Sequence, residues 1–135
     1  MTSRFSSELP VRPDDIDQFQ HVHNSRYLDY IQAARYHQMV NCYKMSMKEF
    51  MDRGFGFVVK KATLNFKRAL VMGDEMIVHT QVREISHTDI IIDVEIFHKA
   101  KNKLVLDAEM IYTMINLETG WSEKIPDDVR EKYLV

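Results

Sequence analysis

The sequence has few cysteines, prolines and glycines, the residues that are common in disulfide-rich proteins and in flexible linkers. Its 135 residues include one cysteine, Cys42, so an intrachain disulfide is impossible. Its three prolines and four glycines do not gather into a linker, and we find no internal repeat or low-complexity tract. We therefore expect residues 1–135 to form a single domain.

Long apolar runs and an excess of one charge are also missing. No segment approaches membrane-spanning length, and the start, MTSRFSSELP, lacks the apolar core of a signal peptide. A cytoplasmic protein without membrane insertion is the expectation. The 18 Lys and Arg nearly balance the 20 Asp and Glu, which gives a net charge of −2. A general nucleic-acid binder needs a basic excess, so nucleic acid is not an expected partner.

Apolar periodicity divides the chain into a helical first part and a β second part. Nothing between Asn24 and Tyr43 breaks a helix, and the apolar residues there cover more than one helical face. A short helix is expected from Ser46 to Arg53, stopped by Gly54, and a short surface helix from Pro126 to Leu134. The remaining segments alternate with period two and predict strands near 58–67, 76–82, 90–97 and 104–114.

The lengths of these elements fit together. A helix of about 20 residues spans roughly 30 Å, and a strand of about ten residues spans roughly 34 Å. One long central helix can therefore lie along the inner face of a curved antiparallel sheet of four or five strands, an α+β arrangement. Such a sheet leaves exposed edges and a small core, so pairing of edges predicts a homodimer or homotetramer.

The segment from Val11 to Arg35 carries the residues suited to chemistry at a carbonyl group. Asp17, His21, His23 and the expected helix start at Asn24 fall within eight residues. First-turn N–H groups of a helix have no intrahelical partner and would stabilise an oxyanion. A carboxylate on the preceding loop can activate water or attack the carbonyl carbon itself. The spacing of residues on an irregular loop does not make their side chains converge on one point, so no metal site is expected from the two histidines.

The same segment resembles a known family. The pattern D-x3-H-V-x-N-x2-Y-L-x-Y-x4-R, from Asp17 to Arg35, is similar to that of the 4-hydroxybenzoyl-CoA thioesterase family of hotdog proteins. LNFKRALVMGDEMIV, from Leu64 to Val78, resembles the second strand, turn and third strand of that family. The resemblance runs from Leu9 to about Asn116. It implies a hotdog fold and hydrolysis of an acyl-CoA or acyl-carrier thioester to a free acid and a thiol.

The resemblance also implies roles for individual residues. Asp17 matches the catalytic aspartate, acting as base or nucleophile, and the backbone N–H of Asn24 matches the donor that polarises the thioester carbonyl. His21 either packs the loop or transfers a proton. Active sites in this family form between subunits, and basic side chains hold the phosphates of coenzyme A. Coenzyme A is part of the substrate, and no separate cofactor is expected.

Further residues are candidates for substrate binding. Aromatic and apolar ones would line an acyl pocket, and basic or polar ones would contact coenzyme A. The candidates are His23, Tyr27, Phe57, Val59, Lys60, Arg68, His87 and Thr88. Nine methionines either fill the core or form a compliant wall for a flexible acyl chain, and composition leaves both readings open.

Two departures from the family pattern and two alternative functions stay open. Gln20 stands where many relatives have Gly, and His23 stands where Asn is common. An enoyl-CoA hydratase-like enzyme would also pair an Asp with a His. The spacing from Asp17 to His21 is one residue short for that enzyme, and its flanking motif is missing. A non-catalytic module that binds acyl-CoA or an acyl carrier protein is the second alternative.

Overall fold

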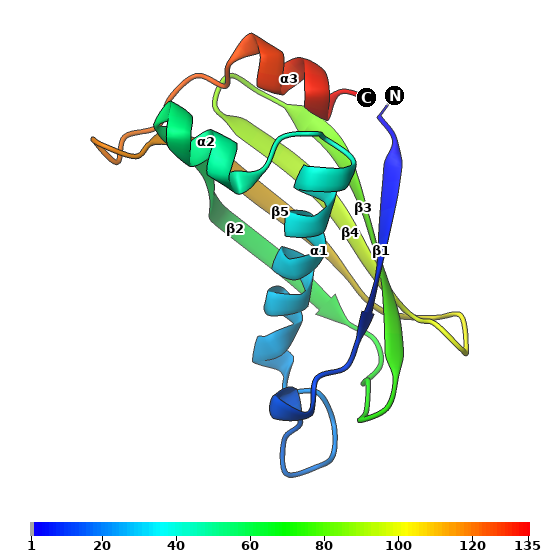
Figure 1. Ribbon diagram of the computed structural model, residues 1–135. Helices are drawn as coiled ribbons and strands as arrows, with labels where there is room; N and C mark the ends of the chain where they lie inside the picture. The colour runs from blue at the N-terminus through cyan, green and yellow to red at the C-terminus, as the bar shows by residue number, and fades with distance from the viewer. Residues whose placement is uncertain (1) are drawn as a thin grey trace.

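A five-stranded antiparallel sheet and one long helix make up most of the protein (Figure 1). The computed structural model describes residues 2–135. The strands are β1 Arg4–Pro10, β2 Phe55–Phe66, β3 Glu75–Ile85, β4 Asp89–His98 and β5 Lys103–Asn116. The helices are α1 Tyr27–Asn41, α2 Met47–Arg53 and α3 Asp127–Tyr133. The expected α+β arrangement is confirmed.

The strand order β1-β3-β4-β5-β2 leaves β1 and β2 at the two edges. Helix α1 lies across one face of this sheet, while α2 and α3 gather near one end of it (Figure 1). Alternate residues of the central strands face α1 and are fully buried, among them Ile90, Ile96 and Met110. Burying such a side chain contributes roughly 1.5–3 kcal/mol each, so this layer supplies most of the core.

Local sequence signals explain where the elements end. The Ser46 hydroxyl accepts a hydrogen bond from the Glu49 N–H at 3.2 Å and caps the start of α2. Gly54 ends α2 in the left-handed conformation with φ of 88°. Asn102 turns the chain between β4 and β5 with φ of 51°. The short helix, the hairpin and their boundaries are therefore close to those predicted.

The structure differs from the sequence expectation at the first strand and the first helix. Strand β1 was not predicted, because only Phe5 and Leu9 are apolar in it and it lies on an edge. The helix expected from Asn24 starts as a 3-10 turn, Asn24–Arg26, and α1 ends at Asn41. The sheet covers one face of α1 and leaves Tyr36 and Val40 on its outer face 50% and 42% exposed.

None of the helices within residues 2–135 is long and apolar enough to cross a membrane.

Candidate active site

Hydrogen bonds between backbone groups close the loop that carries Asp17. The Asp17 N–H donates to the His21 carbonyl at 2.8 Å, and the Gln20 N–H donates to the Asp17 carbonyl at 3.1 Å. Bridges from Ile16 to Val22 and from His21 to Val71 continue this pairing. The loop is therefore a narrow hairpin fastened to the segment that joins β2 and β3, which fixes where Asp17 lies.

The Asp17 side chain is half-buried, and only one of its two carboxylate oxygens is hydrogen-bonded. Its Oδ1 accepts hydrogen bonds from the Phe19 N–H at 2.8 Å and the His21 N–H at 3.3 Å. Its Oδ2 accepts no hydrogen bond from any residue that the structure describes. One oxygen orients the carboxylate while the other remains able to contact a water molecule or a substrate.

The turn that opens the helix leaves one backbone donor without a partner. His23 Nδ1 accepts from the Ser25 N–H at 3.2 Å, and the Arg26 N–H donates to the His23 carbonyl at 2.8 Å. The Asn24 N–H has no hydrogen-bond partner among residues 2–135. His23, predicted to bind substrate, thus caps the turn, and Asn24 keeps the donor required of an oxyanion site.

A buried acid that sequence reasoning missed joins this loop to α1. The Asp15 carboxylate, 5% exposed, accepts from the Tyr30 hydroxyl at 2.5 Å and the Arg12 Nε at 2.9 Å. Burial alone would raise the pKa of Asp15, but the hydrogen bonds from Tyr30 and Arg12 lower it overall. No local pattern could reveal this joint, because Tyr30 lies fifteen positions further along the chain.

Tyr27 contacts the segment between β2 and β3, and Arg68 lies within that segment. Tyr27 is buried, and its hydroxyl accepts from the Leu70 N–H at 3.1 Å. Tyr27, predicted to bind substrate, thus holds this segment from a core position. Arg68 is exposed and donates to the Leu104 carbonyl at 2.9 Å. It lies two residues before Leu70, whose carbonyl accepts from Val22 in the Asp17 loop.

Three other candidates meet around Asp89. The Lys60 ammonium pairs with the Asp89 carboxylate at 2.9 Å, and the Thr88 hydroxyl donates to the same carboxylate at 3.0 Å. His87 is exposed beside them. Six strand residues of about 3.3 Å each separate Lys60 from the end of β2, close to Arg68. Within one chain, the Asp89 group and Arg68 are therefore apart.

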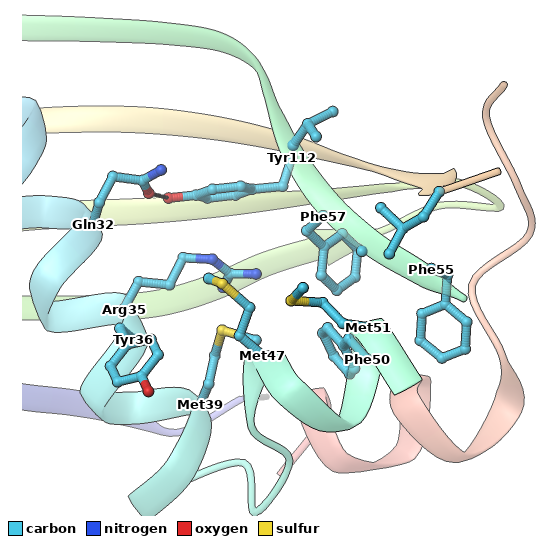
Figure 2. A pocket seen from close by; sticks show the side chains of 13 residues that line it. Gln32, Arg35, Tyr36, Met39, Met47, Phe50, Met51, Phe55, Phe57 and Tyr112 are labelled. Atoms are coloured by element: carbon cyan, nitrogen blue, oxygen red, sulfur yellow. Dashed lines mark hydrogen bonds between the residues drawn. The ribbon is translucent and has the colours of Figure 1, made fainter. Parts of the chain in front are cut away.

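An apolar cavity of about 280 Å³ opens between α1, α2, the start of β2 and β5 (Figure 2). Exposed Met47, Met51 and Val58 form its rim, and buried Met39 and Phe50 lie deeper. Its other lining residues are Gln32, Arg35, Tyr36, Phe55, Gly56, Phe57, Tyr112 and Leu117. Three of the nine methionines thus form a compliant wall, while others, such as Met76 and Met114, fill the core.

Phe57 alone of the predicted binding residues lines this cavity, and Val59 lies two residues further along the exposed edge. Sequence reasoning missed the cavity because only the folding of α1, α2 and β2 against β5, which is distant in the chain, forms its walls. In the described part of the chain, no three His, Cys, Asp or Glu side chains lie close enough to hold a metal ion.

Comparison with known proteins shows which family has this architecture. The model of the thioesterase-like superfamily matches residues 11–133. The chain belongs to this superfamily. Structurally it resembles the DHNA-CoA thioesterase of Staphylococcus aureus, with a TM-score of 0.89, 19% identity, and coverage of 96% of this chain and 88% of that one. The expected hotdog fold and thioesterase family are confirmed.

Two curated relatives that are similar in sequence to the chain act on different kinds of thioester. It is 26% identical over 126 residues to the long-chain acyl-CoA thioesterase FadM of Escherichia coli (strain K12), covering 93% of this chain and 94% of FadM. It is 27% identical over 127 residues to the chloroplastic acyl-acyl carrier protein thioesterase ATL3 of Arabidopsis thaliana, covering 94% of this chain and 66% of ATL3.

Proposed function

We propose that this member of the thioesterase-like superfamily hydrolyses an acyl-CoA or acyl-carrier thioester to a free acid and a thiol, with Asp17 as its catalytic carboxylate. The observation that carries the proposal is that one short segment holds a carboxylate with one free oxygen and, seven residues later, a backbone N–H without a partner. Asp17 Oδ2 and the Asn24 N–H both lack partners among residues 2–135. The curated relatives FadM and ATL3 are thioesterases, which supports the same reaction class here.

The chemistry assigns a separate task to each group. The Asn24 N–H stabilises the negative oxygen that forms when the thioester carbonyl is attacked. Asp17 either takes a proton from an attacking water or attacks the carbonyl carbon to form an anhydride that water then cleaves. In both routes water adds to the acyl group, and the sulfur leaves with a proton as the thiol. His21 contributes its backbone N–H, which holds Asp17 Oδ1 in place.

A dimer through the edge of β2 would unite the separated candidates. Pairing of two antiparallel copies of β2 reverses their ends. Active sites in the family that the chain resembles form between subunits, so the group around Asp89 (Lys60, His87 and Thr88) of one copy would belong to the same site as the Asp17 loop of its partner. These basic and polar side chains are suited to bind the phosphates of coenzyme A. The smallest complete assembly is therefore a homodimer.

The decisive experiment replaces Asp17 and follows thiol release from short, medium, long and aromatic acyl-CoAs. Asp17→Asn should lower kcat by on the order of a hundredfold or more, with little change in KM, because the amide keeps the shape but not the charge. Asp14→Asn, at an exposed acid of the preceding turn, is the matched control and should keep full activity. Undiminished turnover by Asp17→Asn would remove Asp17 from this role.

The same assay separates the two alternatives. An enoyl-CoA hydratase would consume enoyl absorbance without releasing thiol. A binding module would bind acyl-CoA tightly and turn over no substrate of the panel. Either result would overturn the proposed hydrolysis.

A further inference from the structure

A four-residue turn between β2 and β3, residues 71–74, lies at the same end of the sheet as the Asp17 loop (Figure 1). The Asp74 N–H donates to the Val71 carbonyl at 3.1 Å and closes the turn, with Gly73 in its third position at φ of 91°. The Asp74 side chain adds a second closure, because its Oδ2 accepts from the Val71 N–H at 2.9 Å. Asp74 therefore binds both polar groups of the Val71 backbone.

This turn holds the segment that carries Asp17 at both of its ends. At the start of the segment, the Val11 N–H donates to the Asp74 carbonyl at 2.9 Å. At its end, His21 forms a bridge with Val71. Asp17 lies between these two attachments in the chain, so the position of its carboxylate depends on the shape of the 71–74 turn.

The second oxygen of Asp74 faces a histidine at the end of β4. His98 Nε2 lies 3.2 Å from Asp74 Oδ1, and the two side chains are 11% and 20% exposed. His98 Nδ1 accepts from the Lys101 N–H at 3.1 Å, so the proton of the neutral ring is on Nε2, the atom that faces the carboxylate. The 71–74 turn contacts one oxygen of Asp74 and the β4–β5 hairpin contacts the other, and together they fix its orientation.

Tyr27 lies within the influence of both Asp74 and Asp17. Burial raises the pKa of Tyr27, the hydrogen bond from the Leu70 N–H lowers it, and the negative charges of the two carboxylates raise it further. The two acids differ in what they leave free. Both oxygens of Asp74 have a neighbour, whereas Asp17 Oδ2 has no hydrogen-bond partner among residues 2–135. Asp74 is therefore suited to hold the site and Asp17 to react in it.

We propose that Asp74, oriented by His98, is a positioning residue for thioester hydrolysis that acts through the turn to which the Asp17 loop is bound. This role rests on the proposed function, because it assigns a second carboxylate to the same site. Asp74 contacts no substrate in this role. Misplacing a reacting group by about 1 Å can cost on the order of a hundredfold in rate, so loss of the Asp74 side chain lowers turnover.

Replacement of Asp74 tests this role through kinetics. Asp74→Ala should lower kcat at least about tenfold and leave KM within about twofold, since substrate still binds but Asp17 is misplaced. Asp74→Asn keeps an oxygen that can accept from the Val71 N–H and should recover most of the lost turnover. Asp52→Ala, at an exposed ion pair with Lys48, is the matched control and should keep full activity. Turnover is measured at a temperature at which circular dichroism shows every variant folded.

Two substitutions of His98 separate the two contacts of its ring. The amide oxygen of His98→Asn can replace Nδ1 as the acceptor for the Lys101 N–H, but this side chain is too short to reach Asp74. The longer side chain of His98→Gln brings an amide N–H close to the position of Nε2 and so keeps the contact with Asp74. His98→Gln should therefore have a kcat at least about threefold higher than that of His98→Asn. A role confined to the hairpin would give the opposite order.

Hydrogen–deuterium exchange followed by mass spectrometry reports on the loop without any substrate. The amides of Asp17, Gln20 and Val22 are hydrogen-bonded in the folded loop. In Asp74→Ala the peptide that contains them should exchange at least about tenfold faster, while peptides of β4 and β5 keep their protection. Asp74→Asn should exchange like the unmodified protein.

Full turnover by folded Asp74→Ala, beside an active unmodified protein, would overturn the positioning role and leave the proposed function standing. Unchanged exchange of the loop in Asp74→Ala would also overturn it, as would a rise in KM with unchanged kcat, because Asp74 would then act in binding. If Asp74→Ala fails to fold, the two His98 variants decide by the order of their kcat values. An unmodified protein that hydrolyses no thioester would remove the proposed function, and this role with it.

Discussion

Gln20 is held in a backbone conformation that favours glycine. Its φ is 67°, and its N–H closes the turn on the Asp17 carbonyl. An L-residue in this region has its Cβ too close to the following carbonyl, at a cost of roughly 1–2 kcal/mol. Many members of the family that the chain resembles have glycine here. This chain adopts the positive φ without glycine, so its folded state carries the strain.

Replacing Gln20 should therefore reveal this strain. Gln20→Gly is expected to raise the free energy of unfolding by about 0.5–1 kcal/mol, since relief of the strained φ exceeds the extra entropy of glycine in the unfolded chain. Urea unfolding measures the change. Gln20→Ala is the control, because it removes the side chain but keeps the Cβ. Equal stability of the Gly and Ala variants would show that the backbone at this position is not strained.

At the scale of elements, one buried acid joins the Asp17 loop to the long helix. Asp15 receives hydrogen bonds from Tyr30 on α1 and Arg12, and its backbone carbonyl accepts from the His23 N–H at 2.8 Å. These contacts position the loop and the start of the helix relative to each other. The geometry of the proposed site therefore depends on a buried residue that has no role in the proposed chemistry.

The charge of Asp15 should make this joint sensitive to acid. The pKa of Asp15 lies below its ordinary value of 3.8, because the hydrogen bonds outweigh the effect of burial. A lowered pKa adds stability that is present above the unfolded value and is lost as pH falls through the folded one. Asp15→Asn should thus lower the free energy of unfolding by roughly 2 kcal/mol at pH 7. The deficit should begin to shrink as pH falls below about 4, where the unfolded chain takes up a proton that the native carboxylate still resists, and should vanish below the folded pKa.

Urea unfolding of both proteins between pH 7 and pH 3 measures this difference. Asp14→Asn, one residue earlier and exposed, should change stability by less than about 0.5 kcal/mol at either pH. A deficit in Asp15→Asn that stays constant across the range would show that the negative charge contributes nothing.

The regular elements could be predicted from sequence because each buries one periodic face. Alternation along β4 and β5 and the breaker-free run of α1 report burial within the same segment. The Asp17 loop was predictable as well, through a motif that is contiguous in the chain. The Asp15 joint and the Arg35 cavity were not, because their contacts join residues from distant elements. Arg35 itself ends the motif that resembles the family, but only packing shows that it is buried.

At the scale of the whole molecule, β2 is the longer of the two edge strands of the sheet. The strand is twelve residues long, and Val58 and Phe66 are 41% and 44% exposed on it. Beside it, Tyr36 and Val40 leave the outer face of α1 partly apolar. Long unprotected edges favour pairing with another strand. A second copy that added its own β2 would cover the edge and complete the proposed active site.

The register of β2 identifies a substitution that tests this pairing. The Lys67 N–H donates to the Val105 carbonyl at 2.8 Å, so along this part of β2 alternate residues, including Thr63, bond to β5. Ala62 therefore directs its N–H toward the open edge. Proline there should block pairing of two copies while sparing the contacts with β5. Ala62→Pro should sediment as a monomer and lose thioester hydrolysis.

Thr63→Pro is the matched control, because it removes a bond within the chain. It should lower the free energy of unfolding by about 3 kcal/mol, whereas Ala62→Pro should leave an isolated chain cooperatively folded. Sedimentation velocity and thermal unfolding distinguish the two. A dimer that persists in Ala62→Pro, or an unmodified protein that sediments as a monomer at micromolar concentration, would exclude pairing through β2. In that case the Asp17 loop and the Lys60 group could not be parts of one site assembled across this edge.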